Sequence, residues 1–398
     1  MSSSNLVFEK VIKSSPADVF RAFTTPLGYQ EWLCWHASVM PHPGGPLHLV
    51  WANSYFTSGY YLELIPAQKV TFTWFGKGDP APTTVEVVVR EEIGQTRVIL
   101  THRDLGSGSE WNPSREEISR GWERNLENLV SVLETGRDLR QINRPMLGIS
   151  DINELDSVTA SKLGVPVQAG LVVGTPLDGF GAMLAGMKKG DVLVELAGVP
   201  INHYAAFHTE MQKHTAGETV PVVVYRGTEK LSLSVSLSHP PIPEPPATAV
   251  DLANALRAQT RQADMELEKC FDGVSEEQAA WAPAPGEWSA LEVLAHLIQV
   301  ERDLHTVIQT TLADQIYEWT DNAPARISGT VSIYPTVPAL IEVLKQTEDE
   351  TYAIVADLPD QFVQRKASFW SFAQMMLSIT SHTISHIAQI RSALGKTK

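Results

Sequence analysis

Cysteine is nearly absent from this sequence: its 398 residues include only Cys34 and Cys270, which lie far apart. Such sparse cysteine excludes a disulfide framework and fits a reducing interior. The chain also lacks an uninterrupted apolar run of about 18 residues, the length that a transmembrane helix needs. Its first residues, MSSSNLVFEK, show no basic segment followed by an apolar one. We therefore expect a soluble cytoplasmic protein without a membrane partner.

Positively charged residues are also few relative to negatively charged ones. The chain has 31 Lys and Arg against 46 Asp and Glu, a net charge of −15. Proteins that bind nucleic acids or anionic membranes need excess cations to neutralise phosphates, so the sequence argues against both partners. The 43% hydrophobic and 19% charged residues are typical of globular proteins. A length of 398 residues predicts two or three domains.

Proline marks the clearest division of the chain. The stretch SHPPIPEPPATA carries prolines at 240, 241, 243, 245 and 246, which predicts a semi-rigid polyproline-type linker. A helical pattern that ends at Gly136 marks a weaker boundary. The expected domains are 1–138, 142–239 and 248–398, with 240–247 as the linker.

The first domain has the pattern of an antiparallel sheet with one long helix. Residues 69–75, 83–91 and 96–102 alternate with period two, as half-buried strands do. Residues 114–134 follow with apolar side chains at helical spacing. Six of the ten tryptophans of the chain also lie in this domain. We expect a curved sheet that packs against the helix around a concave space.

The motifs SPADVFRAFTTPLGYQEW, GYYLELIP, TFTWF, TRVILTH and GWERNLENL occur in an order that resembles the START-like helix-grip (SRPBCC) superfamily, in the branch related to activators of the heat-shock ATPase chaperone. The resemblance implies a pocket for a small apolar molecule. The candidate pocket residues are Trp32, Trp51, Trp74, His102 and Trp122. Any one of these tryptophans also suits a plain core. For His102, as for Glu63, a satisfied surface residue is the alternative.

The middle domain contains AGMKKGDVLVELAGVPI and a predicted hairpin around Gly227. These features resemble a PDZ domain of the bacterial HtrA-like arrangement, with a small β-barrel fold. The resemblance places a loop that binds a protein C-terminus on Met146, Leu147, Gly148 and Ile149. The stretch TPLDGFGAMLAG departs from the family by its extra glycines, which puts the shape of the groove in doubt. A spacer or dimer contact is the alternative role.

The last domain has the pattern of a four-helix bundle. Ser289 and Glu292 form a capping box that predicts a helix with His296 in its second turn. Ser371 and Gln374 predict the start of a final helix, on which His382 and His386 share a face. Residues 251–271 and 338–358 supply the other two helices. His305 lies nine residues after His296 and is expected to point away from it.

Trp288-Ser289, one histidine on the second helix and a terminal H-x-x-x-H followed by Gln389 resemble the DinB/YfiT-like superfamily. In that family three histidines bind a divalent metal, which implies His296, His382 and His386 as ligands here. Three histidines with a fourth position open are typical of catalytic zinc, while nickel and iron also suit imidazole. Buried histidines paired with neighbours are the alternative.

Two other functions are disfavoured for this bundle. The stretch H-T-I-S-H lacks the glutamate of H-E-x-x-H, so a zincin-type metalloprotease is excluded. Residues 248–398 hold 11 Lys and Arg against 20 Asp and Glu, which argues against direct DNA binding.

Three functions stay open from the sequence. In the first, the bundle is an enzyme, and the resemblance implies a metal-dependent transferase of the thiol-transferase type. Alternatively the chain is a non-enzymatic sensor or scaffold, with a small ligand in the first domain and a protein partner on the PDZ-like domain. In the third reading the metal is only structural. A homodimer through the helical bundle is a further expectation.

Overall fold

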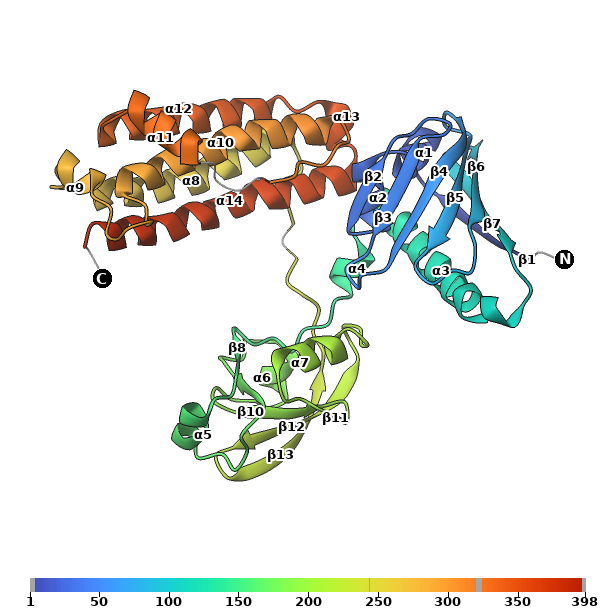
Figure 1. Ribbon diagram of the computed structural model, residues 1–398, viewed down its shortest axis with the longest axis horizontal. Coiled ribbons are helices and arrows are strands. Elements are labelled where there is room, and N and C mark those ends of the chain that lie inside the picture. The colour runs from blue at the N-terminus through green and yellow to red at the C-terminus, as the bar shows by residue number, and fades with distance from the viewer. Residues whose placement is uncertain (1–3, 243, 320–323, 396–398) are drawn as a thin grey trace. The chain divides into compact units, whose positions relative to one another are not determined.

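The computed structural model describes residues 4–242, 244–319 and 324–395 (Figure 1). The chain forms two compact units, one made of Met1–Gly136 with Glu244–Lys398 and the other of Arg137–Pro243. Together they contain two antiparallel sheets and a helical bundle. The predicted fold class, a multidomain α+β chain with an all-α bundle, is therefore confirmed. Residue 243 of the predicted linker lies outside the described residues.

A seven-stranded antiparallel sheet forms the first part of the chain, in the order β1-β7-β6-β5-β4-β3-β2. Its strands are β1 (Ser4–Ile12), β2 (His36–Val39), β3 (Pro46–Val50), β4 (Phe56–Ile65), β5 (Lys69–Gly76), β6 (Thr83–Glu92) and β7 (Gln95–Leu105). The last three are the strands that the period-two alternation predicts. On β5, for example, Val70, Phe72 and Trp74 are buried, because successive side chains point to opposite faces of the sheet.

One long helix, α3 (Asn112–Thr135), lies across a face of this sheet (Figure 1). Ile118, Trp122, Leu126 and Leu129 pack from α3 into the core. The helix ends at Gly136, whose φ of +79° is a left-handed conformation that glycine adopts without strain. The shorter elements beside it are α1 (Pro16–Ala22), α2 (Pro26–Trp32) and η1 (Ser109–Trp111).

The second unit contains a small antiparallel sheet in the order β13-β12-β10-β9-β8, with β11 paired to β10. Its strands are β8 (Ile152–Glu154), β9 (Leu171–Val173), β10 (Val192–Leu196), β11 (Val199–Pro200), β12 (Thr219–Arg226) and β13 (Glu229–Ser236). Its helices are α4 (Leu139–Ile142), α5 (Ser157–Leu163), α6 (Gly181–Leu184) and α7 (Tyr204–Met211). Strands β12 and β13 form the predicted hairpin, and Gly227 in its turn has a φ of +58°.

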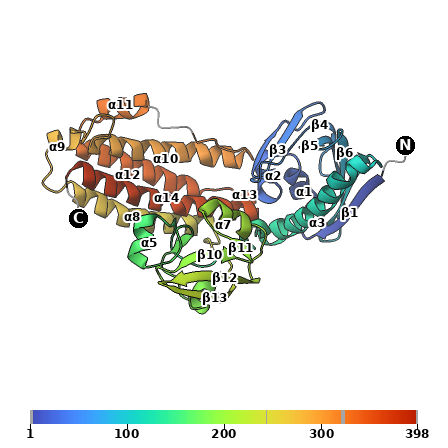
Figure 2. The same ribbon diagram turned by 60° about the horizontal axis from the view of Figure 1, so that its bottom comes forward.

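Four long helices lie side by side in the C-terminal bundle, as Figures 1 and 2 both show. They are α8 (Ala249–Cys270), α10 (Ala290–Leu312), α12 (Val337–Ala356) and α14 (Lys366–Ala393). Short helices α9 (Glu276–Ala280), α11 (Pro324–Ile333) and α13 (Asp360–Val363) connect them. The predicted capping box of α10 is confirmed: the Ser289 backbone N–H donates to Glu292 at 2.8 Å, and the Glu292 N–H donates to the Ser289 hydroxyl at 3.3 Å.

The predicted start of the last helix is wrong. Helix α14 begins at Lys366, so Ser371 and Gln374 lie inside it rather than at its cap. Phe369 and Phe372 are buried in the bundle core, and Ala367 packs against the core of the first sheet. This tertiary packing extends the helix beyond the local capping signal, because most helical stability in proteins comes from burial of an apolar face.

The start of α14 also joins a buried ion network with α1 and α2. Arg21 pairs with Glu31, and its guanidinium donates to Asp314 at 3.1 Å. The Ser368 hydroxyl on α14 donates to Glu31, while Arg365 donates to Asp314 at 2.9 Å. The helical bundle and the first sheet are therefore linked by charge-assisted hydrogen bonds within one compact unit.

In the described ranges no single helix is both long and apolar enough to cross a membrane. Helices α11 and α12 meet that criterion only as a pair, and they are bent by 112° relative to each other.

Candidate metal centre and binding sites

Three histidines from two helices converge inside the bundle. His296 comes from α10, and His382 and His386 lie one turn apart on α14. Their Nε2 atoms are separated by 3.5 Å (His296–His382), 3.1 Å (His296–His386) and 3.0 Å (His382–His386). Among the described residues, no other group of three or more His, Cys, Asp or Glu brings its ligand atoms this close together. The structure thus brings one ring nitrogen from each of three histidines close to one point.

This donor set fits a divalent metal. Three tetrahedral ligands at about 2.0–2.1 Å from zinc have nitrogens about 3.3–3.4 Å apart, close to the separations here. The Nδ1 atom of His386 lies 2.7 Å from Oε1 of Gln389. Since an amide oxygen only accepts, Nδ1 carries the proton and Nε2 presents a lone pair. Gln389 therefore holds His386 in the tautomer that a metal ligand requires.

The triad lies partly buried in the bundle, beside an aromatic ring. His296 is buried, and the Trp288 ring lies against it with centroids 5.1 Å apart. Burial, and then the neighbouring His386, lower the pKa of His382 below its usual value. Neutral imidazole is the form that binds metal, so this environment favours the binding form of His382. His382 and His386 are only half-buried, so the site lies toward the surface of the bundle.

His305 lies outside the triad, on another face of α10. Its Nε2 is 3.0 Å from the hydroxyl of Thr351 on α12, and Thr351 donates to Glu301 at 2.8 Å. Glu301 is one of three buried carboxyl side chains, together with Asp264 on α8 and Glu348 on α12. None of the three was predicted from the sequence. The sequence does contain a signal for them: each of these acidic residues falls at the helical spacing of the apolar residues on its own helix.

In the second unit, the loop that resembles a carboxylate-binding loop is Met146–Ile149. The backbone of Met146 pairs with Ser238, with N···O distances of 3.0 and 2.8 Å. Gly148 has a φ of +79°, and a Cβ added there would lie 2.1 Å from Cβ of Phe180. Phe180 belongs to TPLDGFGAMLAG, the stretch that departs from the family pattern. This stretch therefore packs directly on the loop.

An open sheet edge continues from this loop. Strand β8 follows it directly and is the last strand of its sheet, paired on one side with β9. Helix α7 is tied to β8, because the N–H of Tyr204 donates to Glu154 at 2.8 Å. An edge strand beside a helix can accept an extended peptide as an additional strand.

Replacing Gly148 by alanine is expected to abolish binding of peptides with free C-termini. The new methyl group meets Phe180, and the left-handed φ adds strain of about 1–2 kcal/mol, so the loop must shift. Fluorescence polarisation of the full chain with a C-terminal peptide library measures this. Gly179→Ala is the matched control, since Gly179 also has a positive φ but a Cβ there meets no atom within 4 Å. Equal binding of free and amidated C-termini by the parent would contradict the site.

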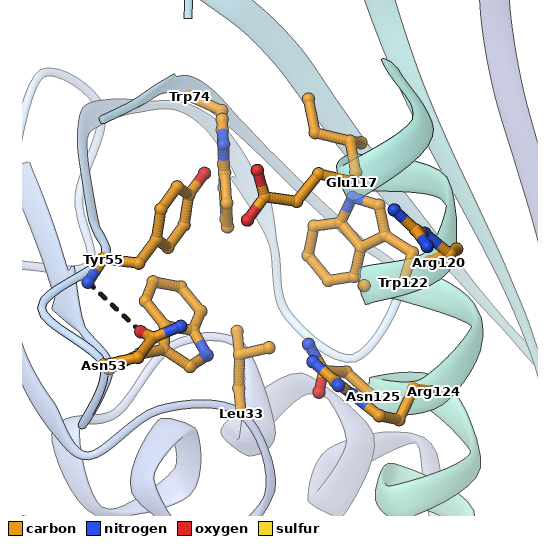
Figure 3. Close-up of a pocket in the computed structure, with 12 residues that line it drawn as sticks. Leu33, Asn53, Tyr55, Trp74, Glu117, Arg120, Trp122, Arg124 and Asn125 are labelled. Atoms are coloured by element: carbon orange, nitrogen blue, oxygen red, sulfur yellow. Dashed lines mark hydrogen bonds between the residues drawn. The ribbon is translucent and has the colours of Figure 1, made fainter. Parts of the chain in front are cut away.

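A cavity of about 370 Å³ lies between α3 and the first sheet (Figure 3). Trp51, Trp74 and Trp122 line it, together with Leu33 and polar residues of α3. Trp32, in contrast, is fully buried in the core, where its indole donates to the Ala22 carbonyl at 3.0 Å. Glu63 is on the surface in an ion pair with Lys69 at 2.9 Å. Three of the five candidate pocket residues thus line the cavity.

The fifth candidate, His102, lies behind the cavity wall. It is fully buried, and burial lowers its pKa to about 4, so it is neutral at pH 7. The Trp122 indole donates to its Nδ1 at 3.0 Å, which leaves Nε2–H to donate to Thr83 at 2.7 Å. His102 therefore fixes the orientation of Trp122, a wall of the cavity.

Comparison with known proteins finds similarity to a different family model in each of three successive stretches of the chain. Residues 13–134 match Activator of Hsp90 ATPase homolog 1-like protein, residues 145–237 match the PDZ domain, and residues 236–390 match the DinB superfamily. The Serine protease Do-like HtrA of Lactococcus lactis is 31% identical over 115 residues, 28% of each chain. The human Activator of 90 kDa heat shock protein ATPase homolog 1 is 24% identical over 121 residues, 30% of this chain and 33% of that protein. The chain thus spans a third or less of the length of these relatives.

Solved structures resemble a third of the chain. The Aha1 dimer from Colwellia psychrerythraea is 21% identical and covers 34% of this chain and 98% of its own, with a TM-score of 0.29. An HSP90 activator from Plasmodium falciparum is 22% identical and covers 32% of this chain and 95% of its own, with a TM-score of 0.28. The three family matches follow one another along the chain, so that from its N-terminus onward it resembles the activator of Hsp90 ATPase homologue, then a PDZ domain, then the DinB superfamily.

Proposed function

We propose that this chain is a metal-dependent transferase of the thiol-transferase type, with its active centre in the helical bundle. The observation that carries the proposal is the convergence of three Nε2 atoms within 3.0–3.5 Å of one another. Three protein ligands leave a position for an exchangeable group, which is the composition of catalytic rather than structural zinc sites. Zinc, nickel and iron all suit these donors.

The residues around the triad have separable roles. His296, His382 and His386 would hold the ion, and Gln389 orients His386. Trp288 covers one side of His296 and shields it from water. A divalent metal held there would lower the pKa of a bound thiol, so that the thiolate is available at neutral pH. A reducing cytoplasm, expected from the two free and buried cysteines, would keep such thiols reduced.

Peptide binding by the PDZ domain is a second function, and it is compatible with the first. The open edge of β8 beside α7 and the Gly148 loop support it. In the alternative without catalysis, this domain and the cavity of the first domain act as a scaffold and sensor, and the metal is structural.

Cobalt substitution distinguishes a catalytic metal from a structural one. If an open coordination position exists, adding a small thiol to the cobalt-loaded protein is expected to produce a thiolate-to-cobalt charge-transfer absorption band. The titration is repeated with the corresponding alcohol, which should produce no such band. A cobalt spectrum that no thiol changes would mean a closed, structural site and would contradict the transferase.

A further inference from the structure

Strand β13 forms a second open edge on the sheet of the second unit. It is the last strand at the end opposite to β8, and it pairs on one side only, with β12. Both views show it at the margin of the unit (Figures 1 and 2). It runs beside β12 for 8 residues without a shift of register. This edge is distinct from the β8 edge, where the proposed peptide would bind.

Alternate residues of β13 direct their backbone N–H and C=O groups away from β12. The two-residue turn of the hairpin makes Arg226 and Glu229 a hydrogen-bonded pair, so the odd-numbered residues of β13 bond to β12. Ser238 follows in phase with the even-numbered residues, and its N–H and C=O bond to the backbone of Met146 at 2.8 and 3.0 Å. The even-numbered residues therefore direct these groups toward the open edge.

Only part of this edge is free. Ser236 is covered, because Gly181 packs so closely on its carbonyl that an added Cβ would lie 1.8 Å from the oxygen. The other even-numbered residues are exposed, and their outward groups have no partner in the described part of the chain: Lys230, Ser232 and Ser234. The free stretch therefore covers residues 229–235, with Ser232 at its centre.

The sequence of this stretch suits pairing with an identical strand. From Leu231 onward serine alternates with apolar residues, without the lysine, proline or bulge by which edge strands avoid pairing. Leu231 and Leu233 are only partly buried against the core of the unit. An antiparallel copy centred on Ser232 places Leu231 opposite Leu233 of the second copy. Lys230 then lies opposite Ser234, so no like charges face each other.

We propose that β13 is a self-association edge, at which two copies of this chain pair β13 with β13, antiparallel and centred on Ser232. Each hydrogen-bonded pair of residues then exchanges two N–H···O bonds, and Leu231 and Leu233 become buried between the copies. The free stretch is about 24 Å long at about 3.4 Å per residue. This is short for a permanent dimer, so we expect a dissociation constant of about 100 µM. The inference does not depend on the metal centre or on peptide binding.

Charges placed at the centre of the paired strands test this arrangement. Ser232→Lys would face its own copy, so it is expected to weaken association by about tenfold or more. Residue 232 is exposed, so the fold should be unaffected. Ser232→Glu alone should have the same effect, whereas an equimolar mixture of the two variants should restore association, because opposite charges then face each other. Sedimentation velocity of the full-length chain, from about 10 µM to about 1 mM, measures these changes.

Cross-linking checks the register independently. Both native cysteines are buried, so a short bis-maleimide should join two copies only through a new thiol. Ser232→Cys is expected to give a covalent dimer. Thr228→Cys is the matched control, since Thr228 is exposed in the same hairpin, but its two copies would lie about 27 Å apart in this register.

Four outcomes would overturn the proposal. One is a parent chain that stays monomeric at about 1 mM. Another is a dimer that Ser232→Lys does not weaken, because such a dimer forms elsewhere, for example through the helical bundle. The third is a mixture of the lysine and glutamate variants that stays monomeric. The last is equal cross-linking of Ser232→Cys and Thr228→Cys.

Discussion

Replacing His386 by alanine is expected to remove most of the metal from the purified protein, by more than about 100-fold in affinity. The Nε2 atom of His386 lies 3.1 Å from that of His296 and 3.0 Å from that of His382, so its loss leaves two nitrogens that cannot enclose an ion. Elemental analysis of the protein made with zinc, nickel and iron supplied measures the content and identifies the metal.

His305→Ala is the matched control for this change. It removes the same kind of side chain from the helix that carries His296, yet His305 contacts Thr351 and not the triad. Its metal content should equal that of the parent, and circular dichroism should show that both variants keep their helices. Equal metal content in all three proteins, or none in a parent made with metal supplied, would mean that the histidines are ordinary residues of the bundle.

The second large effect concerns the buried carboxyls Asp264, Glu301 and Glu348, which project from three helices into the bundle core. Each is at least nine-tenths buried. Burial raises the pKa of all three, that of Glu301 to about 7, and the negative charges of Asp264 and Glu301 raise that of Glu348 further. The positive charge of nearby Lys345 lowers the pKa of Asp264, whereas the negative charges of Glu268 and Asp349 raise it further. His305 reaches the group through Thr351.

Raised carboxyl pKa values give a definite sign to the pH dependence. Above the ordinary carboxyl pKa of about 4, the folded chain retains protons that the unfolded chain releases. The free energy of unfolding should therefore fall as pH rises, by about 1.4 kcal/mol per pH unit for each retained proton. The fall should begin near about pH 5 and, because Glu348 is shifted most, continue above neutral pH.

Glu348→Gln is expected to make the free energy of unfolding less dependent on pH. It should also raise that free energy by about 2–4 kcal/mol at about pH 8. The amide is neutral at every pH, so folding no longer requires a carboxyl group to keep its proton. Urea unfolding followed by the helical circular dichroism signal, at about pH 6 and about pH 9, measures the change. Glu342→Gln on the same helix is the control, since Glu342 is exposed. A Glu348→Gln chain less stable than the parent at both pH values would contradict the expectation.

Local sequence signals predicted elements well wherever burial and local capping agreed. The Ser289–Glu292 box marked the start of α10, and period-two alternation marked β5, β6 and β7. At Ser371 the same kind of signal failed. Helix α14 begins earlier because Ala367, Phe369 and Phe372 pack into two cores, and a local motif contains no information about distant partners.

The residues around the cavity also show that local sequence does not predict how a side chain packs. Trp32 and Trp51 are the same residue type in the same domain, yet one fills the core and the other lines open space. Glu117 and Gly121, which also line the cavity, were ordinary helix positions in the sequence. Their role depends on which side of α3 faces the opening, and this is set by packing against the sheet.

The sequence by itself indicated three successive domains, and its resemblance to the DinB/YfiT-like superfamily indicated the three histidines of the candidate metal centre. Spacing along a helix places two of them, His382 and His386, on one face. Only the tertiary structure decided that His296, on a helix 86 residues earlier in the chain than His382, meets them at 3.1–3.5 Å. It also decided that three carboxyl groups share the bundle core. Periodicity assigns side chains to faces of a helix, whereas the distance between two faces depends on how the helices pack, and this is a property of the whole fold.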